Sequence, residues 1–125
     1  MENVEKLKNA RNLLLKLHKV MIDFEREMHE GIHGPLTAGQ FLNVLIEDED
    51  FAWLRKFSML IVEIDEMFDL KDGVTPELVE ANLVKIAELV EMREDDEYFR
   101  AKYQNIVQKH VDAAALQSEL RSMFG

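Results

Sequence analysis

Residues 51–68 read FAWLRKFSMLIVEIDEMF, and the rest of the chain is organised around this stretch. On a helical wheel at about 100° per residue its large apolar side chains fall on one broad face, which is typical of a helix with one buried side. Glu63 and Glu66 fall opposite, and Leu60-Ile61-Val62 breaks the alternation of a strand. The stretch therefore predicts a buried central helix with these inward residues: Trp53, Leu54, Phe57, Leu60, Ile61, Ile64, Met67 and Phe68.

A second, smaller apolar strip lies on the far side of this helix and consists of Met59 and Val62. We therefore expect the helix either to be nearly enclosed by the fold or to contact a partner. Asp50 precedes the helix, and its carboxylate can accept a hydrogen bond from an otherwise unpaired N–H of the first turn. The sequence thus predicts Asp50 as the N-cap.

The N-terminal segment predicts a long helix from about residue 3 to about residue 30, ended by a left-handed Gly31. Its apolar side chains cover more than half of the circumference, which is wider than a one-sided contact needs. We expect this helix either to contact several neighbours or to meet a second subunit.

Capping and turn signals divide the rest of the chain. Thr37 and Gln40 have the spacing of a capping box, which predicts a short helix over residues 38–47. Asp72-Gly73 indicates a turn, and Thr75-Pro76-Glu77 indicates the start of a fourth helix. On the short helix we expect these residues to face inward: Phe41, Leu42, Leu45 and Ile46.

The last helical segment opens after the acidic run at residues 94–97. Its early apolar positions are out of phase with the later ones, so we predict a break near Val111-Asp112 with Asp112 capping a final short helix. The expected inward residues before the break are Phe99, Tyr103, Ile106, Val107 and His110.

Length and composition indicate a single all-α domain over residues 1–125, a four-to-five-helix bundle with a long N-terminal helix and a buried central helix. The chain has no cysteine, which excludes disulfides, thiol nucleophiles and thiolate metal sites. No secretory signal and no membrane-spanning run is visible. We therefore expect a cytoplasmic protein that needs no cofactor.

The formal net charge is -10, with a sequence pI near 4.8. Binding to nucleic-acid phosphates or to anionic membranes needs clustered Lys and Arg, so both kinds of partner are disfavoured. The acidic runs at residues 47–50 and 94–97 precede helices, where carboxylates favour the positive end of the helix dipole. Their other reading is a docking patch for a basic partner.

Three features of the sequence occur together: LLKLHK at residues 14–19, the pair Glu25-Arg26, and above all FAWL at 51–54 leading into IVEIDE at 61–66. In these features the chain resembles a group of short bacterial helical proteins of unknown function. The resemblance implies a bacterial cytoplasmic protein and assigns no activity.

A line of polar residues lies inside the apolar arc of the N-terminal helix. Arg11, His18 and Glu25 are spaced by seven, and His29 follows Glu25 by four. Asp65 sits at the edge of the central helix's apolar face, and His110 sits within that of the last segment. Buried charges need partners, so these six residues predict either a hydrogen-bonded network or a ligand site. In the metal version of that site the ligands are His18, Glu25, Asp65 and His110.

Three functions follow from these patterns. The first is a non-enzymatic interaction or structural protein that forms a homodimer through the N-terminal helix, because that helix is over-wide in apolar surface and no catalytic constellation is present. The second is a metal- or small-ligand-binding bundle that uses the polar line. The third is an acidic mimic of nucleic acid that inhibits a nucleic-acid-binding protein.

Overall fold

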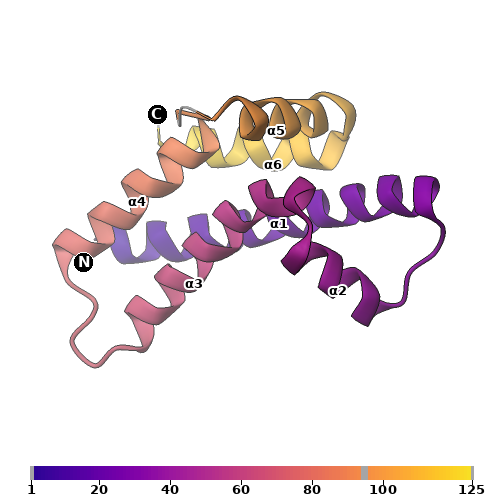
Figure 1. Ribbon diagram of the computed structural model, residues 1–125. Helices are drawn as coiled ribbons and strands as arrows, with labels where there is room; N and C mark the ends of the chain where they lie inside the picture. Colours follow the sequence, from indigo (N-terminus) through magenta and orange to yellow (C-terminus); the bar gives the residue numbers. More distant parts are fainter. Residues whose placement is uncertain (1, 94–95, 125) are drawn as a thin grey trace.

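The computed structural model describes residues 2–93 and 96–124 and is helical throughout, with no strand in these ranges (Figure 1). The all-helical bundle and the long N-terminal helix are confirmed, whereas the predicted count of four to five helices was too low. The described elements, six α-helices and one 3₁₀ helix, are α1 (Glu2–His33), α2 (Ala38–Glu47), η1 (Glu49–Leu54), α3 (Arg55–Asp69), α4 (Pro76–Val90), α5 (Glu97–Lys109) and α6 (Val111–Ser122).

The predicted central helix is two elements, η1 and α3. The side chain of Asp48, and not that of Asp50, accepts the N–H of the first turn, with Asp48 Oδ1 2.9 Å from Asp50 N. The tighter 3₁₀ turn places residues three apart on one line, so Phe51 and Leu54 point inward together. The prediction of Asp50 as the cap was therefore wrong. The burial predicted for the stretch is confirmed except at Phe68, which is only partly buried.

α1 continues through Gly31 and ends at His33. The left-handed residue that follows it is Gly34, with a φ of 90°. The predicted stop at Gly31 was wrong because the helix ends where the chain turns towards Pro35, one turn later.

The last segment breaks at His110, close to the predicted position. His110 closes α5 and opens α6, and its Nδ1 accepts a hydrogen bond from the N–H of Ala113 at 3.3 Å. Asp112 lies in the first turn of α6 and is not the cap that was predicted. The acidic run before α5 falls partly outside the described residues, at 94 and 95, while Asp96 caps α5 by accepting from Phe99 N at 3.0 Å.

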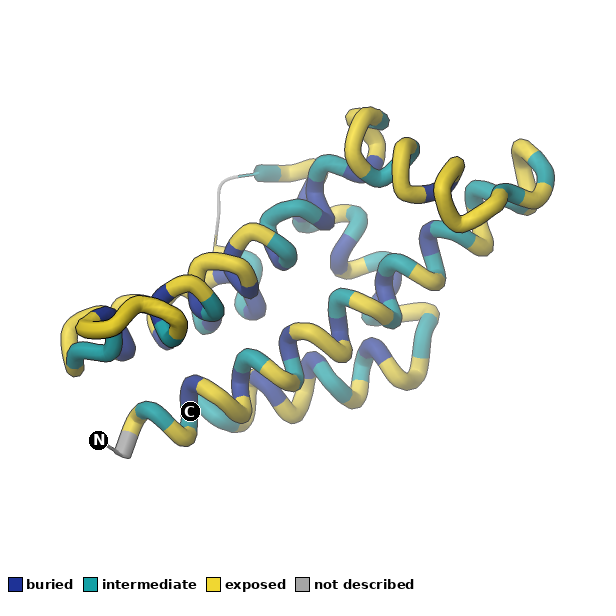
Figure 2. Tube along the Cα trace, turned by 90° about the horizontal axis from the view of Figure 1, so that it is seen from below, coloured by how far each residue is buried: buried dark blue, intermediate teal, exposed yellow. Residues whose placement is uncertain are grey.

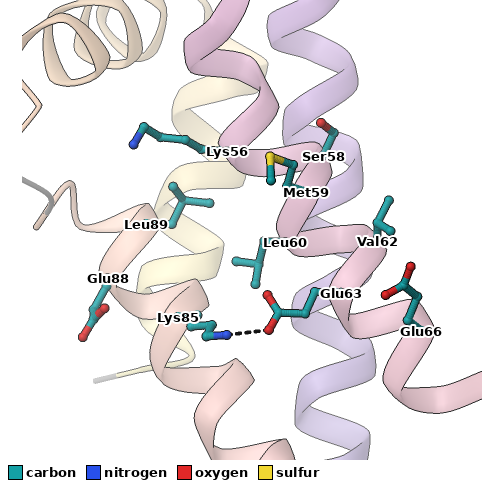
Figure 3. Close-up of a pocket in the computed structure, with 10 residues that line it drawn as sticks. All are labelled: Lys56, Ser58, Met59, Leu60, Val62, Glu63, Glu66, Lys85, Glu88 and Leu89. Carbon is teal, nitrogen blue, oxygen red and sulfur yellow. Dashed lines mark hydrogen bonds and ion pairs between the residues drawn. The ribbon is translucent and has the colours of Figure 1, made fainter. Parts of the chain in front are cut away.

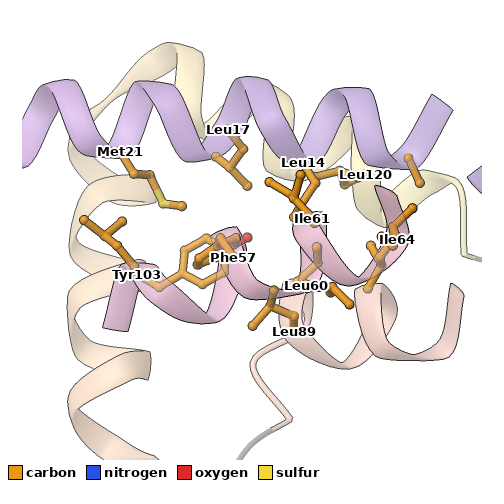
Figure 4. Packing of buried hydrophobic residues seen from close by; sticks show 14 of the residues in the cluster. Leu14, Leu17, Met21, Phe57, Leu60, Ile61, Ile64, Leu89, Tyr103 and Leu120 are labelled. Carbon is orange, nitrogen blue, oxygen red and sulfur yellow. The ribbon is translucent and has the colours of Figure 1, made fainter. Parts of the chain in front are cut away.

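The core lies between α1, η1, α3, α4, α5 and α6, and the buried positions turn inward along each helix (Figures 1 and 2). At its centre Phe57 contacts the rings of Tyr103 at 5.3 Å and Phe99 at 5.8 Å. Figure 4 shows Phe57 and Tyr103 beside Leu17 and Met21 of α1. Aromatic rings at these edge-to-face or tilted separations add to the free energy gained by burying their area.

α2 departs from the predicted pattern, because only Phe41 of its apolar residues is buried. Leu42 and Ile46 were expected inward and are 55% and 60% exposed, since no other element of the described chain covers that side of α2. No helix among the described residues is long and apolar enough to cross a membrane.

Candidate functional site

The polar line on α1 begins with Arg11, which pairs with Asp65 of α3. Arg11 Nε lies 2.9 Å from Asp65 Oδ1, and Arg11 Nη2 lies 2.8 Å from Asp65 Oδ2. This hydrogen bonding raises the pKa of Arg11 and holds its guanidinium in a two-pronged contact. The pair joins the two helices and leaves neither charge free to bind a ligand.

His18 is half-buried and packs against the ring of Phe57 at 6.4 Å. Burial lowers the pKa of His18 from its usual 6.5, because the charged imidazolium is poorly solvated there. The neutral ring borders a cleft between α1, α2 and α3.

Glu25 is buried and is compensated by Lys102 of α5, with Lys102 Nζ 3.2 Å from Glu25 Oε1. The ring of His29 lies tilted against that of His33 at 4.5 Å and meets Phe51 edge-on at 5.7 Å. The line along α1 therefore contacts α3, α5 and η1 in turn and is not gathered at one point.

His110 meets the edge of Phe24 at 6.2 Å while it caps α6. None of the described His, Asp and Glu residues forms a group of three or more that could hold a metal ion. The six residues of the predicted site are thus distributed among separate partners, as a hydrogen-bonded and packed network would be.

A second buried polar network, which was not predicted from the sequence, links α4, α5 and α6. The hydroxyl of Tyr103 donates to Gln117 Oε1, and Gln117 Nε2 donates to the carbonyl of Val90 at 2.6 Å. Burial raises the pKa of Tyr103 above its usual range. The sequence signal for this network was Gln117, which lies four residues after Ala113 and three before Leu120, on the buried stripe of α6.

Exposed apolar side chains gather at the C-terminal end of α1. We call this surface the α1-end patch. It is a shallow depression of about 560 Å³ lined by Phe24, Glu27, Met28, Gly31 and Ile32. Met28 is 54% exposed and Ile32 is 76% exposed. An added Cβ at Gly31 would meet nothing within 4 Å.

A second surface runs from α2 across α3 to α4, and we call it the α2–α4 groove. It joins two clefts of about 570 and 660 Å³ that share Ser58 in their linings. Leu60 and Leu89 are buried at its floor, while Met59 and Val62 stand on α3 beside it (Figure 3). Its exposed apolar side chains are Leu42, Ile46, Met59 and Val62.

The cations along the groove are engaged by groups of the chain itself. Lys85 Nζ lies 2.5 Å from Glu63 Oε1, a contact drawn in Figure 3, and Lys56 Nζ lies 3.6 Å from Asp96 Oδ2. Arg55 donates to the carbonyls of Leu45 and Ile46, so it closes the C-terminal end of α2.

Comparison of the chain with protein-family models, with curated proteins and with solved structures gives no match. The resemblance to short bacterial helical proteins and the cytoplasmic location stay predictions.

Proposed function

We propose that this chain is a non-enzymatic interaction protein that pairs with a second copy of itself through the α1-end patch. The observation that carries the proposal is the line of Phe24, Met28 and Ile32, spaced by four residues along one side of α1 and open to solvent at its end. Apolar side chains in such a row form a stripe that a second helix can cover.

Most of the broad apolar face of α1 is accounted for within the chain. Leu7, Leu14, Leu17 and Met21 are fully buried, and α1 contacts α3, α4, α6 and η1. Apart from Leu15, which is 41% exposed, the exposed large apolar side chains of this helix lie in its last turns. These turns supply the surface for a partner.

Gly31 supports a close approach at this surface. A glycine inside a helix destabilises it by about 1 kcal/mol relative to alanine. No neighbouring atom in the described chain requires a glycine at position 31, because a Cβ there would meet open space. In a symmetric dimer the same patch meets itself, so Met28 or Ile32 of one copy can lie over Gly31 of the other.

The charge of the chain predicts an unusual salt dependence. Two copies with a net charge of -10 repel each other, whereas burial of the apolar patch favours their association. Salt screens the repulsion, so we expect dimerisation to tighten as NaCl is raised from about 0.05 M to about 0.5 M.

Sedimentation equilibrium over a range of protein concentrations tests the proposal. We expect a monomer–dimer equilibrium that Ile32→Glu and Gly31→Leu weaken by about tenfold or more. Gly39→Leu is the matched control, since Gly39 also lies in a helix with open space around it. A wild-type protein that stays monomeric at every concentration and salt would refute the proposal.

The second prediction, a metal-binding bundle, gains no support from the arrangement of His18, Glu25, Asp65 and His110, which face different partners.

A further inference from the structure

We propose that the α2–α4 groove binds an amphipathic helix of another protein that carries Lys or Arg beside its apolar stripe. The groove lies on different helices from the α1-end patch, so this inference is independent of self-association. It names the class of partner that an interaction protein of this shape can take.

The first support is the arrangement of exposed apolar side chains. Leu42 and Ile46 follow each other by four residues on α2, and Met59 and Val62 by three on α3. They are 55%, 60%, 69% and 53% exposed. Each pair lies along one line of its helix, and the two clefts beside them meet at Ser58. A groove bordered in this way matches the apolar stripe of a docked helix.

None of these four side chains is needed to fill the core. On α3 that role belongs to Leu60 and Ile61, and on α2 to Phe41, all of which are buried. The floor of the groove is therefore already packed, and Met59 and Val62 stand above it. Exposed methionine is a common component of surfaces that accept helices of differing shape, because its side chain is flexible and polarisable.

The charge along the groove indicates which residues the partner should carry beside its apolar stripe. Lys56 and Lys85 are each in an ion pair with a carboxylate of the chain, and Arg55 is bonded to the end of α2. Glu66 and Glu88 also line the groove, are exposed, and have no ion-pair partner among the described residues. Arg55 keeps its positive charge at the α2 end, because backbone carbonyls do not neutralise it. Along the α3–α4 part of the rim the uncompensated charge is that of Glu66 and Glu88 and is negative, which favours a cationic partner there.

The occupant is a helix and not an extended segment. Every described element is helical, so the chain offers no sheet edge whose N–H and C=O groups could pair with a strand. A helix forms its own backbone hydrogen bonds, so it needs only an apolar surface with charged residues along its edges. A second copy of this chain would bring further negative charge to an acidic rim, so it is the less favourable occupant.

The test uses three synthetic peptides of about 18 residues, a length close to five helical turns. The first has leucine at helical spacing with lysine beside the stripe. The second has glutamate in place of each lysine, and the third has the composition of the first in an order without an apolar face. We expect the first peptide to bind and the other two to bind at least about tenfold more weakly.

Methionine methyl NMR locates the contact. Met59 lies in the groove and Met28 lies in the α1-end patch, so one spectrum reports on both surfaces. We expect the lysine peptide to shift the Met59 signal and to leave the Met28 signal in place. A peptide that shifts Met28 alone would overturn the groove assignment.

Variants separate apolar from electrostatic contributions. We expect Met59→Glu to weaken binding of the lysine peptide by about tenfold or more, because it places a charge in the apolar contact. The double variant Glu66→Lys, Glu88→Lys should reverse the preference between the lysine and glutamate peptides. Met28→Glu is the matched control for Met59→Glu and should leave peptide binding unchanged, whatever it does to self-association.

Peptide binding and self-association should also respond to salt in opposite directions. Binding of the lysine peptide should weaken as NaCl rises, whereas self-association should tighten. Circular dichroism of each variant verifies that the bundle is folded. The proposal is overturned by equal binding of the lysine and glutamate peptides, by full binding to Met59→Glu, or by no binding of the lysine peptide up to its solubility limit.

Discussion

Arg11 and Asp65, 54 positions apart in the sequence, join α1 to α3 through two parallel hydrogen bonds of 2.9 and 2.8 Å. Their side chains are 26% and 45% exposed, so water still screens the pair. The contact fixes the rotation of α3 relative to α1 at the position where both helices turn their apolar faces inward. The pair is a structural tie with a measurable contribution to stability.

Removal of this tie should reduce stability modestly. We expect Asp65→Asn to lower the free energy of unfolding by about 1 kcal/mol, the upper range for a partly exposed pair with two-pronged geometry. Asp23→Asn breaks the exposed Lys19–Asp23 pair within α1 and serves as the control, with an expected loss of about 0.3 kcal/mol. Urea unfolding measures both, and equal effects would contradict the structural role.

The Tyr103–Gln117–Val90 network should be strongly coupled. Gln117→Leu leaves the Tyr103 hydroxyl and the Val90 carbonyl buried without a partner, so we expect a loss of about 2 kcal/mol. Tyr103→Phe strands only Gln117 Oε1 and should cost about 1 kcal/mol. The double variant should cost less than the two losses added together. Additive losses in urea unfolding would show that the network is not coupled.

Gly73 should not tolerate a side chain. A Cβ at this position would lie 2.4 Å from the carbonyl oxygen of Met67 and 2.7 Å from Leu70 Cβ. The turn between α3 and α4 would have to open, so we expect Gly73→Ala to cost about 2 kcal/mol of unfolding free energy. Gly39→Ala meets open space in α2 and should instead stabilise the protein by up to about 1 kcal/mol. Thermal unfolding distinguishes the two signs.

His18 should make stability fall in mildly acidic solution. Burial lowers the pKa of His18 below 6.5 in the folded state, so between the two pKa values the unfolded chain binds more protons. Stability is full above the unfolded pKa, falls as the pH drops through it, and levels off below the folded pKa.

We therefore expect the wild type to lose more stability than His18→Leu between about pH 7.5 and about pH 5. Parallel pH dependence of urea unfolding in the two proteins would show that the His18 ring is not desolvated.

The sequence predicted the buried stretch well but not its internal boundary. Residues such as Trp53, Leu54 and Phe57 point inward whether the backbone is α-helical or 3₁₀, so their spacing does not distinguish the two. The end of α1 had a similar ambiguity, because Gly31 and Gly34 are both able to stop a helix. The turn was decided by position 34, which precedes Pro35.

The candidate site was predicted as a set of residues, without its partners. The heptad spacing of Arg11, His18 and Glu25 predicted polar groups along the packed side of α1, where Glu25 is buried and Arg11 and His18 are half-buried. The partner of Glu25 is Lys102, whose place depends on how α5 docks. Sequence periodicity within one helix carries no information on that docking. The capping role of His110 was missed because imidazole is an unusual N-cap.

The most informative difference between the sequence prediction and the structure lies in α2. An amphipathic pattern predicts that Leu42 and Ile46 are covered, yet it does not say by which chain. No described element lies over them, and both side chains border the groove for which a partner helix is proposed above. The exposed residues are therefore where prediction and structure together point beyond the single chain.

The anchoring of α2 has a consequence for motion. It is attached by Phe41, which meets the ring of Phe51 at 6.0 Å, by the partly buried Val44 and Leu45, and by the Arg55 guanidinium at its end. Phe41 is the buried residue of α2, whereas α3 buries Phe57, Leu60, Ile61, Ile64 and Met67. The amide protons of α2 should therefore exchange with solvent deuterons well before those of α3. We therefore expect α2 to move more readily than the rest of the bundle, and α2 forms one wall of the groove.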